Sequence, residues 1–151
     1  MNLILESLNN IFQRDLDNTI KEINTYNSEA DLWKVEDGIN NSAGNLSLHL
    51  CGNLSYFVGV VLGNSGYQRN RDAEFSDKNI PREELIQKLE ETKKSISSTL
   101  AKLSIDDLEK LFPVQVWKDR NYSTLQFLIH LATHLNYHLG QINYHRRLLT
   151  K

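Results

Sequence analysis

Cysteine, proline and glycine are all scarce in this sequence of 151 residues, which holds 1 Cys, 2 Pro and 7 Gly. A single cysteine excludes an intramolecular disulfide and any zinc site built from several thiolates. The scarcity of helix-breaking residues leaves room for long helices. The length is typical of one domain, residues 1–151, because single cores usually span about 100–200 residues.

An excess of basic residues is also lacking, since 17 Lys and Arg stand against 19 Asp and Glu for a net charge of -2. We therefore expect no nucleic-acid partner, because such surfaces need clustered positive charge. The N-terminus carries Glu6 and lacks the basic segment and cleavage site of an export signal. The most apolar stretch, residues 46–62, contains His49, Asn53 and Ser55 and lies at the lower edge of membrane-spanning length. We interpret it as a buried helix and predict a cytoplasmic protein without membrane contact.

Four segments carry apolar residues at steps of three and four, which predicts helices over residues 2–26, 43–62, 81–103 and 124–149. Ser104, with Asp107 three residues on, resembles a capping arrangement and predicts a short extra helix before the last long one. The sequence thus predicts an all-α protein, a four-helix bundle. The connection over residues 63–80 is long enough to run the length of such a bundle, which allows a crossover topology.

Four of the five histidines, His130, His134, His138 and His145, lie on one side of the last predicted helix. Neighbours at i and i+4 are close enough to share one metal ion, whereas His130 and His138 are about 12 Å apart along the helix. A chelating pair is therefore either His130 with His134 or His134 with His138. Each pair needs a third ligand from another element, and His49 is the remaining histidine.

Structural interpretations compete with this metal site. A lone His49 on an apolar helix is more often a core histidine. His145 precedes two arginines at a helix end, where we predict a solvated cation favoured by the helix dipole. His130 either hydrogen-bonds a ligand or packs in the core. Cys51 points about 200° away from His49 around the helix, so we interpret it as a buried free thiol.

Two stretches resemble a known family. They are Asn45-Leu-Ser-Leu-His49-Leu-Cys-Gly-Asn53-Leu and His130-Leu-Ala-Thr-His134-Leu-Asn-Tyr-His138-Leu-Gly140-Gln141-Ile142. The first is similar to the second helix of the DinB-like (DinB/YfiT-like) superfamily of metal-dependent enzymes. The second is similar to its last helix, where a His-x-x-x-His pair precedes Gly-Gln. The resemblance spans nearly the whole chain and implies His49, His134 and His138 as the metal ligands.

This resemblance also implies further properties of the protein. It implies an up-down-down-up four-helix bundle, a homodimer, and a divalent transition metal, with nickel or zinc as the expected ion. Characterised relatives transfer or use low-molecular-weight thiols such as bacillithiol, mycothiol or glutathione. A small-molecule thiol is therefore the expected substrate.

Three histidines leave coordination positions open, which is the pattern of a catalytic metal site. The ion would lower the pKa of a coordinated thiol or water, so thiol transfer and hydrolysis are both candidate reactions. A metal-binding bundle without catalysis, such as a dimerisation module, and a bundle without metal are the alternatives. Asn53, Tyr137 and Gln141 are weak candidates for an assisting catalytic group, because each lies within helical reach of a histidine.

Overall fold

The computed structural model describes residues 2–150, and these residues form an all-helical structure without β-strands. Its elements are α1 Leu3–Thr25, the 3₁₀ turn Ala30–Trp33, α2 Ala43–Leu54, the π-helical segment Ser55–Leu62, α3 Arg71–Ser76, α4 Arg82–Leu100, α5 Ile105–Glu109 and α6 Thr124–Leu149. The four predicted long helices are therefore confirmed to within a few residues at their ends.

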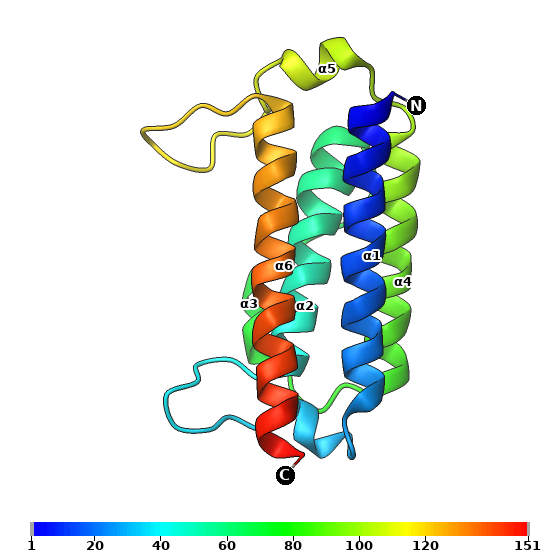
Figure 1. Ribbon diagram of the computed structural model, residues 1–151. Helices are drawn as coiled ribbons and strands as arrows, with labels where there is room; N and C mark the ends of the chain where they lie inside the picture. Colours follow the sequence, from blue (N-terminus) through cyan, green and yellow to red (C-terminus); the bar gives the residue numbers. More distant parts are fainter. Residues whose placement is uncertain (1, 151) are drawn as a thin grey trace.

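The long helices lie side by side (Figure 1). The first, α1, packs against α4 and α6, and α2 packs against the same two helices from the other side. In Figure 1, α1 and α6 run in one direction and α2 and α4 run in the other. Apolar faces of all four meet in one core, with Phe12, Leu50, Leu89 and Leu135 fully excluded from solvent.

Capping residues explain where the last two helices begin. Ser104 caps α5 and Ser123 caps α6, each accepting from the backbone N–H three residues on. The side chain of the third residue of each helix, Asp107 or Gln126, accepts a hydrogen bond from the backbone N–H of the capping serine, which satisfies a second free N–H group. The predicted short extra helix is thus present as α5.

The segment 63–80 is more structured than the sequence analysis predicts, because it contains α3, which packs against α2 (Figure 1). Asn70 caps this helix by accepting from the N–H of Ala73. With six residues, α3 is too short to show a helical period of apolar residues, so its stability comes mainly from packing.

The second long helix changes its winding part-way. After Leu54 it continues as a π-helical segment over Ser55–Leu62, which ends with the N–H of Gly63 bonded to the carbonyl of Val58 at 3.0 Å. Residues Ala43–Leu62 form the one described helix long and apolar enough to cross a membrane, with a mean hydropathy of 1.3. Every residue of α2 is buried, as in the core helix of a soluble protein.

Candidate metal centre

Two packed helices supply the histidines of the candidate site. His134 and His138 lie one turn apart on α6, so their side chains project to the same side. His49 lies in the middle of α2, which packs against α6. The apolar surroundings that bury α2 therefore also bring His49 into contact with the pair on α6.

The three imidazoles converge through their Nε2 atoms. His134 Nε2 lies 3.3 Å from His49 Nε2 and 3.1 Å from His138 Nε2. One ligand atom from each of the three residues lies within 4.8 Å of the other two. The histidine pair that meets His49 is therefore His134 with His138, which resolves the alternative that helical spacing leaves open.

The outer nitrogens of two histidines have hydrogen-bond acceptors. His49 Nδ1 lies 3.0 Å from Glu74 Oε1, and His138 Nδ1 lies 2.6 Å from Gln141 Oε1. A carboxylate and an amide oxygen accept, so both Nδ1 atoms carry the proton and both Nε2 atoms keep a free lone pair. These two lone pairs face His134, in the form that a metal ion requires.

His134 is the central member of the group and the most perturbed electrostatically. Burial, together with the neighbouring imidazoles of His138 and His49, lowers the pKa of His134 to about 4. Burial also lowers the pKa of His138, although its bond to Gln141 opposes this. Both rings are therefore neutral near pH 7. Among the described residues, His134 Nδ1 is buried without a hydrogen-bond partner.

Two of the three separations between the ligand nitrogens match those around a single transition-metal ion. Bonds of about 2.0–2.1 Å in a tetrahedral arrangement place neighbouring ligand nitrogens about 3.3 Å apart. The separations of 3.3 Å and 3.1 Å around His134 Nε2 agree with that spacing. Neutral imidazoles with inward lone pairs are suitable donors for divalent first-row metals.

The remaining two histidines have other environments. His130 lies edge-on against Trp117, with ring centroids 4.9 Å apart, and its centroid is 6.1 Å from that of His134. It belongs to an aromatic group outside the set of converging nitrogens, and burial lowers its pKa. The prediction that His145 is a solvated cation is wrong, because this residue is only 4% exposed. His145 Nε2 donates to the Lys34 carbonyl at 2.9 Å, and Nδ1 pairs with the Tyr26 hydroxyl at 2.7 Å.

The three weak catalytic candidates lie in different settings. Gln141 is bonded to His138 and donates from Nε2 to the Tyr137 hydroxyl at 3.3 Å, so it orients a histidine. Tyr137 is 65% exposed beside it. Asn53 is buried on α2, and its Oδ1 has no hydrogen-bond partner among the described residues. None of the three contacts the converging Nε2 atoms through a hydrogen bond in the described structure.

A cleft of about 440 Å³ lies beside this region. His138 contributes to its wall, together with Tyr137, Gln141 and Tyr144 from α6 and the loop around Asn40. This volume is adequate for a small molecule, since ligand pockets usually measure about 300–1,000 Å³.

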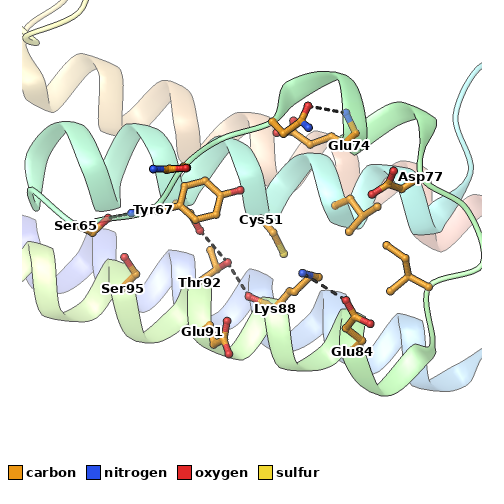
Figure 2. A pocket seen from close by; sticks show the side chains of 16 residues that line it. Cys51, Ser65, Tyr67, Glu74, Asp77, Glu84, Lys88, Glu91, Thr92 and Ser95 are labelled. Carbon is orange, nitrogen blue, oxygen red and sulfur yellow. Dashed lines mark hydrogen bonds and ion pairs between the residues drawn. The ribbon is translucent and has the colours of Figure 1, made fainter.

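A second cleft, of about 490 Å³, lies between α2, α4 and the connection that carries α3 (Figure 2). Cys51 points into it from α2. Burial raises the pKa of this thiol to about 12, so it is protonated and unreactive. Its interpretation as a buried free thiol is confirmed.

Comparison with known protein families identifies one matching family. The sequence matches the family described as a protein of unknown function, DUF1572, over residues 2–151. The chain belongs to this family. No curated protein matches the sequence.

In this DUF1572 protein, Glu74 and Arg69 are the residues at the site that sequence analysis misses. Glu74 comes from α3 and meets His49 across 25 residues of chain. Arg69 precedes α3 and bonds both carboxylate oxygens of Glu74 at 2.8 Å. The only local signal is the pattern of Asn70 followed by acidic residues, which marks a helix start and gives no indication of a partner on α2.

Proposed function

We propose that this protein is a divalent-metal-dependent enzyme of the DinB-like kind, with His49, His134 and His138 as the ligands of one ion. The convergence of the three Nε2 atoms at 3.1 Å and 3.3 Å supports the proposal most directly. The antiparallel and parallel pairing of α1, α2, α4 and α6 supports an up-down-down-up four-helix bundle as its architecture. Nickel or zinc is the expected ion, and the cytoplasm the expected location.

The proposed reaction is the transfer or use of a low-molecular-weight thiol. A divalent ion held by three neutral imidazoles supplies a Lewis acid that lowers the pKa of a coordinated thiol or water. His49 and His138 keep their lone pairs on Nε2 because Glu74 and Gln141 hold the Nδ1 protons. The cleft beside His138 admits the remainder of a small substrate, and Tyr137 lies on its wall.

Thiol chemistry is preferred to hydrolysis because of the acid–base groups at the site. Within residues 2–150, Glu74 is the carboxylate that hydrogen-bonds a histidine of the cluster, and it is fully engaged by His49 and Arg69. Coordination lowers the pKa of either group, but a free thiol starts from a pKa of about 8.5 and water from about 15.7, so a coordinated thiol becomes the nucleophilic thiolate with less help from a general base. A non-catalytic metal-binding module, including a homodimer assembled through such bundles, is the alternative function.

The first test is the metal content of untagged native protein and of a His134→Ala variant, measured by elemental mass spectrometry. We expect about one nickel or zinc ion per chain in the native protein and none in the variant, because a site needs its central ligand. Native protein that holds no metal and takes up neither added ion would overturn the proposal.

The second test concerns the thiol. Cobalt-substituted protein should gain a sulfur-to-cobalt charge-transfer band when a small thiol is added. It should then accelerate attack of that sulfur on an alkyl halide, with release of halide. A cobalt protein whose spectrum is unchanged by thiols would instead support the non-catalytic metal-binding alternative.

A further inference from the structure

Glu74 is a buried carboxylate that lies directly behind one histidine of the candidate metal centre. Its side chain is 5% exposed, and Oε1 lies 3.0 Å from His49 Nδ1. A buried carboxylate is costly unless it is paired. Glu74 is paired, because both of its carboxylate oxygens lie within hydrogen-bond distance of Arg69 and one of them also lies within that distance of His49. Glu74 therefore accepts a hydrogen bond from His49 Nδ1, which keeps its proton.

Arg69 holds this carboxylate in one orientation. Arg69 Nε bonds Glu74 Oε2 at 2.8 Å, and Nη2 bonds Oε1 at 2.8 Å. Such two-point contacts fix both position and angle, which a single lysine contact does not. The guanidinium also lies 5.8 Å over the Phe57 ring, which limits its own movement. The positive charge of Arg69 balances the negative charge of Glu74. The pair therefore provides His49 with an oriented hydrogen-bond acceptor and adds little net charge beside the histidines.

Because Gly52 has no side chain, the carboxylate of Glu74 can lie directly against the backbone of α2 at this position. A Cβ atom at position 52 would lie 1.9 Å from Glu74 Oε2 and 2.5 Å from Cδ, both far inside van der Waals contact. Glutamate side chains are usually flexible, but this one is held by His49 and by Nε and Nη2 of Arg69. A methyl group at Gly52 therefore has to displace the carboxylate and break or lengthen these bonds.

We infer that Glu74, clamped by Arg69 and accommodated by Gly52, is the positioning residue that fixes His49 as an Nε2 ligand. Carboxylates that accept from the distal nitrogen of a ligating histidine set its tautomer, orient its ring and raise its basicity. Free imidazole exchanges its proton between the two nitrogens, and protonation at Nε2 would block coordination. This role deepens the proposed function and rests on it, because it assigns His49 to the metal site.

The test compares Zn²⁺ affinity, by competition with a chelator, in native protein and three variants. Glu74→Ala and Gly52→Ala should each bind Zn²⁺ about 10–100-fold more weakly, the usual cost of losing an outer-shell partner of a metal ligand. Gly140→Ala is the matched control, since Gly140 is helical and a Cβ there has no neighbour within 4 Å. Its affinity should match that of native protein. Equal affinity in all four proteins would overturn the inference.

A second measurement separates this role from simple anchoring of α3. Nitrogen chemical shifts of the His49 ring in metal-free protein should show the proton on Nδ1 in native protein and a single proton exchanging between Nδ1 and Nε2 in Glu74→Ala. Glu74→Gln should retain part of the native tautomer bias, because its amide oxygen still accepts. The inference is wrong if the native ring is protonated at Nε2. Native protein that binds no Zn²⁺ contradicts the proposed function, whereas the tautomer measurement still tests the role of Glu74.

Discussion

His145 and the group of His49, His134 and His138 show how different the roles of histidines can be within one helical protein. His138 and His145 lie on the same side of α6, seven residues apart. In the group, Nε2 atoms face one another at 3.1 Å and 3.3 Å. In His145, both nitrogens are bonded, one to Tyr26 and one to Lys34. Position on a helix face is therefore a weak guide to function, and the partners of each ring nitrogen decide it.

Replacement of His138 should break the metal site, whereas replacement of His145 should not. We expect His138→Ala to weaken Zn²⁺ binding by more than about 100-fold, because it removes a ligand itself, and outer-shell losses alone cost about 10–100-fold. His145→Ala should bind Zn²⁺ like native protein in the same chelator competition. Loss of binding in His145→Ala with native folding would mean that the two groups are coupled.

In metal-free protein, His145→Ala should lower the free energy of unfolding more than His138→Ala does, which is the reverse of their order in Zn²⁺ binding. His145→Ala removes the buried bond to the Tyr26 hydroxyl, which keeps its bond to the Ile142 carbonyl. It also removes the bond to the carbonyl of the exposed residue Lys34. Loss of a buried hydrogen-bond partner costs about 1–3 kcal/mol, so we expect a loss in that range in the free energy of unfolding. His138→Ala should cost less, because its ring is partly exposed. Urea unfolding measures both, and equal losses would contradict the assignment of His145 as structural.

Acid should destabilise the metal-free protein through the histidine group. The pKa of His134 is about 4 in the folded protein against an ordinary value of 6.5. As the pH falls from 6.5 toward 4, the unfolded chain binds this proton first, so folding stability is lost over that interval. His130 and His138, whose pKa values are also lowered, act in the same direction. Urea unfolding at several pH values should show a smaller acid effect in His134→Gln.

The smallest expected effect is at His130, which packs against Trp117. His130→Gln should keep one ion per chain, with Zn²⁺ affinity within about threefold of native, because no ligand or bond to a ligand is lost. Elemental analysis and the chelator competition provide the check. A loss of half the metal or more would place His130 in the metal site after all.

Most of the helical framework could be predicted because its signals are local. Apolar residues at steps of three and four mark α1, α4 and α6, and Ser104 and Ser123 mark helix starts through contacts three residues away. The π-helical winding after Leu54 and the short α3 were missed, because neither produces a regular apolar period over enough residues.

By itself, the sequence determined the long helices and the placement of His134 and His138 one turn apart, since both follow from the helical repeat. Only the tertiary structure decided that His49 meets this pair, that Glu74 and Arg69 lie behind His49, and that His145 is buried. These contacts join residues far apart in the chain. Their geometry depends on how whole helices pack, and no local spacing encodes it.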